Sequence, residues 1–249
     1  MFIQILLANC LVIICFNLLM LLPELKMYLL ASDRRILIGL GLYTFQFIMT
    51  KFLLKEKSLW LTQPFNIKSV LKGITAFVIV LLLTIVFVTF LDDDNRINED
   101  SKEFWIRFLS VFILNSLPGA LMEEWLFRYL PFRFVQSGFW KLPANVIFIL
   151  VLLLFTLIHI PAYLFQYHTD LKALGNIFVS GIFLLLIYLM TKNVIFTALF
   201  HAFCNNPEFL TNSDLNWQYF YASVFLITLA WPLIEHKVSE RAARKEDIV

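Results

Sequence analysis

The sequence predicts an all-α, polytopic membrane protein of about eight transmembrane helices that enclose a central intramembrane cavity. Its 249 residues are 60% hydrophobic and only 15% charged, whereas a soluble domain has about 45–50% apolar and about 25% charged residues. The apolar residues collect in long blocks, which is typical of membrane helices. Glutamate, arginine and histidine nevertheless occur inside some of these blocks, and such groups normally face a bundle interior or a hydrated cavity.

Eight segments are candidates for the helices, because a membrane-spanning helix needs about 20 mostly apolar residues. In chain order they are Phe2–Leu22, Ile36–Leu54, Val70–Leu91, Phe104–Met122, Ala144–Ile160, Ile177–Met190, Val194–Phe203 and Trp217–Leu233. The fourth continues into the charged stretch that follows it. The shorter ones, above all the seventh, must tilt, use flanking residues or cross only part of the bilayer.

The domain organisation expected from this pattern is simple. No internal repeat or low-complexity linker divides the chain, so we expect a single integral membrane domain over residues 1–249, with a core at residues 114–206 that carries the polar motifs. The first apolar run lacks a basic n-region and an A-x-A cleavage site. We therefore expect it to remain as a span and not to be removed as a signal peptide.

The charges of the loops predict an orientation. Lys51–Lys72 and the C-terminal tail are rich in basic residues, whereas Asp92–Asp100 is acidic and Pro207–Asn216 has no basic residue. Because basic loops favour the cytoplasmic side, both termini are expected in the cytoplasm, although the basic residues of the first loop (Lys26, Arg34, Arg35) oppose this. A composition rich in Phe, Ile, Lys and Asn is typical of an AT-rich bacterial gene. The expected location is therefore a bacterial cell membrane.

Several other kinds of function are disfavoured by composition. The net charge of +2, without an arginine-rich patch, gives no reason to expect a nucleic-acid partner. Cys10, Cys15 and Cys204 all lie in apolar segments without a CxxC pair. They are expected to be buried small hydrophobic residues and not a disulfide or a thiolate metal site.

Three charges lie close together in the stretch GALMEEWLFRYL, within the fourth apolar block. Glu124 and Arg128 are four residues apart, so they share a helix face and are expected to form an ion pair. Glu123 lies about 100° around the helix from Glu124 and is left available for chemistry. Pro118 and Gly119 precede the pair and predict a kink that opens space for water. Taken alone, the Glu124–Arg128 pair is equally compatible with a snorkelling pair at the membrane interface.

Two of the four histidines also lie in apolar runs, His159 in FTLIHI and His201 in FHAFCNN. His201 and Asn205 are four residues apart and share a face, so the amide can hold the imidazole or bind a developing oxyanion. His168 and His236 are expected to face solvent. Either buried histidine alone is more often structural, but three separate spans that supply polar groups favour a shared site.

These residues resemble the motifs of the type II CAAX prenyl endopeptidases, the CAAX-protease and bacteriocin-processing (CPBP, or Abi) family. The motifs are E-E-x-x-x-R from Glu123 to Arg128, F-x-x-x-H from Phe155 to His159, and H-x-x-x-N from His201 to Asn205. Each motif alone is weak, but the three in this order are specific. The resemblance covers Leu114 to about Asn206, and the first three spans match only in being hydrophobic.

The resemblance implies an eight-helix intramembrane protease with these residues in a cavity. Glu123 would act as general base with His159 as its partner in activating water. His201 and Asn205 would stabilise the oxyanion, and Glu124 and Arg128 would organise the site. We expect a mechanism without metal. A single divalent ion such as zinc, held by Glu123, His159 and His201, stays the alternative, although the chain has no H-E-x-x-H motif.

The expected substrate is a membrane-associated peptide or protein, either a bacteriocin precursor or a prenylated protein, and the lipid bilayer is the other partner. Serine and aspartyl chemistries lack their G-x-S-x-G and G-x-G-D motifs. Two other functions stay open. One is a non-catalytic bacteriocin-immunity or scaffold protein. The other is a small proton-coupled transporter, which is less favoured because the sequence has no Gly-rich span of the kind that unwinds in transporters.

Overall fold

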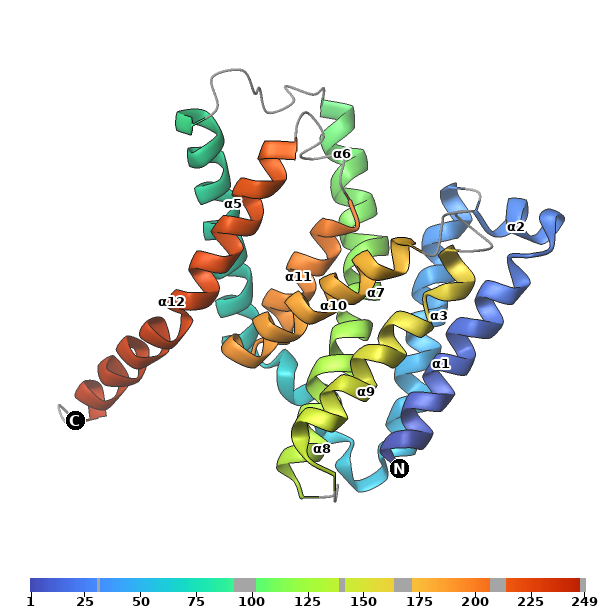
Figure 1. Ribbon diagram of the computed structural model, residues 1–249, viewed down its shortest axis with the longest axis horizontal. Coiled ribbons are helices and arrows are strands. Elements are labelled where there is room, and N and C mark those ends of the chain that lie inside the picture. Colours follow the sequence, from blue (N-terminus) through green and yellow to red (C-terminus); the bar gives the residue numbers. More distant parts are fainter. Residues whose placement is uncertain (31, 92–101, 139–141, 164–171, 207–213, 247–249) are drawn as a thin grey trace.

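The computed structural model describes residues 1–30, 32–91, 102–138, 142–163, 172–206 and 214–246, and over these residues it is all-helical, without strands (Figure 1). The predicted acidic loop Asp92–Asp100 and His168 lie outside the described residues, as does the side chain of His236. Within the described residues, five helices are long and apolar enough to cross a membrane: Phe2–Leu19, Ile36–Lys57, Ile67–Leu91, Lys172–Thr191 and Trp217–Glu235. The chain is therefore an integral membrane protein, while the count of eight spans stays a prediction.

Each of the eight predicted segments is helical. The main helices are α1 (Phe2–Leu19), α3 (Ser32–Leu54), α5 (Ile67–Leu91), α6 (Lys102–Val111), α7 (Leu117–Glu124), α8 (Leu130–Gln136), α9 (Ala144–Leu157), α10 (Lys172–Thr191), α11 (Val194–Cys204) and α12 (Asp214–Glu246). The first loop was not expected to be helical, yet it forms α2 (Pro23–Leu30). Short helical turns join α3 to α5: η1 (Lys55–Lys57), α4 (Leu59–Thr62) and η2 (Gln63–Phe65).

Helical structure extends beyond the fourth predicted segment, as expected from its continuation into the charged stretch. Helical structure continues from α6 through α8, because the π-helical turns η3 (Phe112–Ser116) and η4 (Trp125–Tyr129) join the three helices. Each π turn ends two residues before a proline, Pro118 or Pro131. A proline has no N–H to donate and its ring crowds the carbonyl four residues earlier, so a widened turn accommodates it. Glu123 therefore lies within this continuous helical stretch and not at its end.

The helix α11 forms the centre of the bundle and packs against α5 and α7. All of its residues from Val194 to Phe203 are buried. Its start is set by Asn193, whose Oδ1 accepts from the Phe196 N–H at 2.9 Å while its amide donates to the Ser69 carbonyl at 3.0 Å. Because this cap ties the first turn to α5, the register of α11, and with it the direction of His201, is determined.

The N-terminal helices form the edge of the bundle seen beside α9 in Figure 1. α1 packs on α3, and the fully buried Asn9 donates to the Thr50 hydroxyl at 2.9 Å. Interhelical hydrogen bonds of this kind hold membrane helices together. The cysteines are free; Cys10 is buried, but Cys15 is exposed and Cys204 is half-buried, so the burial expected for all three holds for Cys10 alone.

Candidate active site

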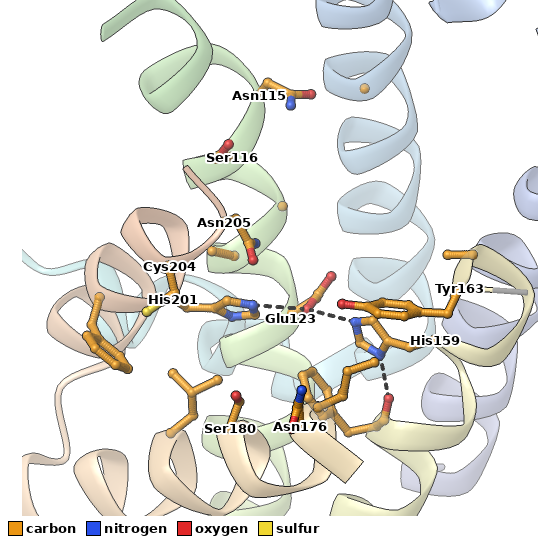
Figure 2. Close-up of a pocket in the computed structure, with 18 of the residues that line it drawn as sticks. Asn115, Ser116, Glu123, His159, Tyr163, Asn176, Ser180, His201, Cys204 and Asn205 are labelled. Carbon is orange, nitrogen blue, oxygen red and sulfur yellow. Dashed lines mark hydrogen bonds and ion pairs between the residues drawn. The ribbon is translucent and has the colours of Figure 1, made fainter. Parts of the chain in front are cut away.

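A pocket of about 910 Å³ is lined by residues from each of the three predicted motifs, which α7, α9 and α11 and the turn after α9 contribute. Its remaining walls come from α1, α3, α10, α12 and the π turn η3. The volume lies within the range of about 300–1,000 Å³ that is typical of ligand-binding pockets. Figure 2 shows Glu123 near the middle, between His201 on one side and His159 on the other. That this pocket lies inside a membrane stays a prediction.

The two adjacent glutamates have different environments. Glu124 is 0% exposed and forms an ion pair with Arg128, which is 2% exposed, at 3.3 Å from Nε to Oε2. This confirms the predicted pair. The Glu123 side chain is 28% exposed and lines the pocket. The rotation of about 100° between neighbouring helix residues therefore directs one carboxylate into the protein interior and the other toward the pocket.

His201 connects the two carboxylates. Its Nδ1 donates to Oε1 of Glu124 at 2.8 Å, and its Nε2 lies 3.8 Å from Oε2 of Glu123. The predicted alternative, that Asn205 holds the imidazole, is wrong, because the acceptor on Nδ1 is Glu124. A carboxylate on Nδ1 determines the ring orientation and leaves Nε2 directed toward the pocket.

His159 approaches Glu123 from the opposite side, with 4.0 Å between its Nε2 and Oε2 of Glu123. We expected His159 within a continuous helix, but α9 ends at Leu157 and His159 lies in the following turn. Pro161 has no N–H to donate to the Leu157 carbonyl, which is consistent with the end of α9 at Leu157, and helical geometry resumes at Ile160. The Nδ1 of His159 donates to the carbonyl of Phe155 at 2.7 Å, so its Nε2 also faces the pocket.

Phe155 contacts the other parts of the site through its ring. The guanidinium carbon of Arg128 lies 4.1 Å from the ring centroid, and the centroid of His159 lies 4.7 Å away in an edge-to-face arrangement. The terminal nitrogens of Arg128 are buried and have no hydrogen-bond partner among the described residues. A cation over an aromatic face is stabilised by about 0.5–2 kcal/mol. The Phe155 ring therefore helps to stabilise the buried guanidinium of Arg128, in addition to the ion pair with Glu124.

Asn205 caps the C-terminus of α11 and lies beside Glu123 and His201 in Figure 2. Its side chain is exposed to the pocket and has no hydrogen-bond partner among the described residues. The structure thus brings together Glu123, His159, His201 and Asn205 in the pocket, with Glu124 and Arg128 directly behind His201.

Other polar residues of the pocket were missed from the sequence. Asn115 comes from η3, Asn176 and Ser180 from α10, and Tyr163 from the turn after α9. Asn176 and Ser180 are four residues apart in an otherwise apolar helix, and this spacing was a signal that could have identified them. Tyr43 of α3 also lines the pocket, and nothing in the sequence around it indicated this.

The comparison with protein families agrees with this geometry. Residues 105–206 match the family model described as type II CAAX prenyl endopeptidase Rce1-like. The chain contains an Rce1-like domain. The three motifs and the helices that carry them lie within this Rce1-like segment. The comparisons with curated proteins and with solved structures give no match. The description of the matching family is that of an endopeptidase, which agrees with the predicted kind of function.

The site has side chains of the kinds that bind zinc, but no metal-binding group is found among the residues that the structure describes. Glu123, His159 and His201 are the right kinds of ligand for zinc, and each histidine has an acceptor on Nδ1, as metal-bound histidines usually do. Among the described residues, however, no group of three or more His, Cys, Asp or Glu side chains is placed to hold a metal ion. The metal-free mechanism stays a prediction.

Proposed function

We propose that the chain is an intramembrane endopeptidase of the CAAX-protease and bacteriocin-processing type, which hydrolyses a peptide bond with water activated by Glu123 and His159. The observation that carries this proposal is the position of Glu123. Its Oε2 lies 4.0 Å from Nε2 of His159 and 3.8 Å from Nε2 of His201, in a pocket large enough for a peptide. These separations are too long for direct hydrogen bonds and suit a bridging water.

The reaction follows from the roles of these groups. Glu123 and His159 orient the water, its oxygen forms a bond to the carbonyl carbon of the substrate, and Glu123 takes its proton. The oxyanion receives hydrogen bonds from the Asn205 amide and from Nε2–H of protonated His201. When the intermediate collapses, the C–N bond breaks and Glu123 returns the proton to the leaving amine. Glu124 and Arg128 act as positioning residues for His201.

The proposed substrate is a membrane-associated peptide or protein, and a bacteriocin precursor or a prenylated protein is consistent with the family. We further propose a bacterial cell membrane with both termini in the cytoplasm, on the basis of the loop charges. In Figure 1 α1 begins and α12 ends on the same side of the bundle, which agrees with an even number of crossings. Residues 1–249 are proposed to act as a single membrane domain with its core at residues 114–206.

The test is cleavage of a membrane-peptide library by the purified protein in lipid nanodiscs, with Glu123→Ala as the control. We expect cleavage by the wild type and none by the variant, although the variant inserts and unfolds like the wild type. Full cleavage by Glu123→Ala would remove Glu123 from the role of base. Activity that disappears with a strong chelator and returns on addition of zinc would replace the metal-free mechanism with a metal-dependent one.

A further inference from the structure

We propose that the pocket binds its substrate as an extended peptide, through main-chain hydrogen bonds to Asn115, Asn176 and Ser180. This inference rests on the proposed function and names the conformation and chemical class of the substrate. The three side chains belong to none of the three catalytic motifs. They supply amide and hydroxyl groups, which both donate and accept hydrogen bonds, as a peptide main chain does.

The first support is that these groups have no partner within the protein. No side-chain hydrogen bond of Asn115, Asn176 or Ser180 is present among the described residues, and all three line the pocket. Asn176 and Ser180 are exposed, although α10 has a mean hydropathy of 2.2 over its membrane window. Polar groups on membrane helices normally pair with one another or face a cavity. A ligand with its own donors and acceptors would therefore satisfy them.

The second support is their arrangement around Glu123. In Figure 2 Asn176 and Ser180 lie on one side of the Glu123–His159 pair, and Asn115 lies on the other side beyond Asn205. A chain passing Glu123 between these walls meets polar groups on both flanks. The scissile carbonyl of this substrate chain is then adjacent to Glu123. The peptide groups on either side of the scissile bond are adjacent to the side chains of Asn115, Asn176 and Ser180.

The third support is the spacing on α10. Asn176 and Ser180 are four residues apart, so they are separated by about 6 Å along the helix axis. In an extended chain, alternate residues repeat at about 6.6–6.8 Å, which matches this separation. A helical substrate rises only about 1.5 Å per residue and uses its N–H and C=O groups internally, so it would leave the pocket amides without partners.

Binding to the inactive Glu123→Gln protein, immobilised in nanodiscs, tests the inference without requiring cleavage. The probes are three pools of short apolar peptides derived from the same parent sequences: unmodified peptides, backbone N-methylated peptides, and peptides restrained as helices by substitution of some residues with α-aminoisobutyrate. We expect the unmodified pool to be retained and the other two to bind at least about tenfold more weakly. Tenfold corresponds to about 1.4 kcal/mol, the contribution of one or two hydrogen bonds.

The matched variants are Asn176→Leu/Ser180→Ala and Ser223→Ala, each combined with Glu123→Gln. The first should lower retention of the unmodified pool about tenfold. The second should leave retention unchanged, because the Ser223 hydroxyl donates to the Tyr219 carbonyl within α12 at 2.9 Å and does not line the pocket. Equal retention of the helical pool, no retention of any pool, or no effect of the Asn176/Ser180 variant would each overturn the inference.

The same peptides separate this inference from the proposed function. If retained peptides are not cut by the wild-type protein, the endopeptidase assignment fails while the extended binding mode stands. If the wild-type protein cuts peptides whose binding is insensitive to N-methylation, the endopeptidase assignment stands and the extended binding mode fails.

Discussion

The two faces of α7 differ in environment at the adjacent residues Glu123 and Glu124. On one face, Gly119 and Glu123 border the pocket. On the other, Glu124 is 0% exposed and contacts Arg128 and His201. The same type of side chain, one residue further along the helix, is thus partly exposed in one case and fully buried in the other.

This difference teaches how an apolar helix can carry reactive and structural carboxylates together. An isolated buried carboxylate is strongly unfavourable, so Glu124 requires its cation and its hydrogen bond. Glu123 borders a polar pocket and needs no such pair within the helix. Substitutions on the two faces should therefore affect different measurements.

The largest expected effect comes from removing the charge of Glu123. Glu123→Gln should lower kcat by about 10²–10⁴-fold, the usual contribution of a general base, with little change in the unfolding midpoint. Glu124→Gln should lower both kcat and the unfolding midpoint, because it disturbs the contacts to Arg128 and His201. Peptide cleavage and thermal unfolding in nanodiscs measure the two effects. A Glu123→Gln protein that is as destabilised as Glu124→Gln would contradict the distinction between the faces.

Breaking the buried ion pair should have the next largest effect. Arg128→Met leaves Glu124 buried without its cation, and the loss of one partner of such a pair costs about 3–5 kcal/mol. The double variant Glu124→Leu/Arg128→Met should recover much of this stability, because it removes both charges. It should still be a poor enzyme, because His201 then lacks the acceptor on Nδ1. Chemical denaturation of the two variants measures the recovery of stability. A double variant less stable than Arg128→Met would contradict the expected recovery.

A smaller effect is expected at Phe155, whose ring contacts both Arg128 and His159. Phe155→Leu and the control Phe134→Leu both replace a buried ring, at 2% and 1% exposure, and each should cost about 1–2 kcal/mol of stability. Only Phe155→Leu should also lower kcat, by about tenfold with KM little changed, because His159 and Arg128 lose their ring contact. Steady-state kinetics at equal amounts of folded protein make the comparison. Equal kcat values would assign Phe155 to packing alone.

The smallest expected effect concerns Gly119, on the same face as Glu123. A Cβ at this position would lie 2.6 Å from the Tyr43 hydroxyl, whereas a Cβ at Gly41 would meet nothing within 4 Å. Gly119→Ala should displace Tyr43 and cost about 1 kcal/mol. Gly41→Ala should stabilise α3 by about 0.5–1 kcal/mol. Opposite shifts of the unfolding midpoint are expected, and shifts of the same sign would show that Tyr43 does not restrict this face.

Much of the architecture followed from local patterns. Long apolar blocks predicted the helices because a membrane span must satisfy its own backbone. The four-residue spacing of Glu124 and Arg128 predicted their pair, and the family motifs predicted which residues to examine. The effects of the prolines were less predictable, because a widened turn precedes Pro118 whereas the helix is interrupted at Ile158 and His159, before Pro161.

The sequence by itself determined the helical class, the membrane character and the different orientations of the two glutamates, since all three depend on composition or on helix periodicity. Only the tertiary structure decided that Glu124, and not Asn205, holds His201, and that Asn115, Asn176 and Ser180 face the same pocket. The physical reason is that these contacts join helices distant in the chain, and helix periodicity determines direction around one axis but not which neighbour lies there.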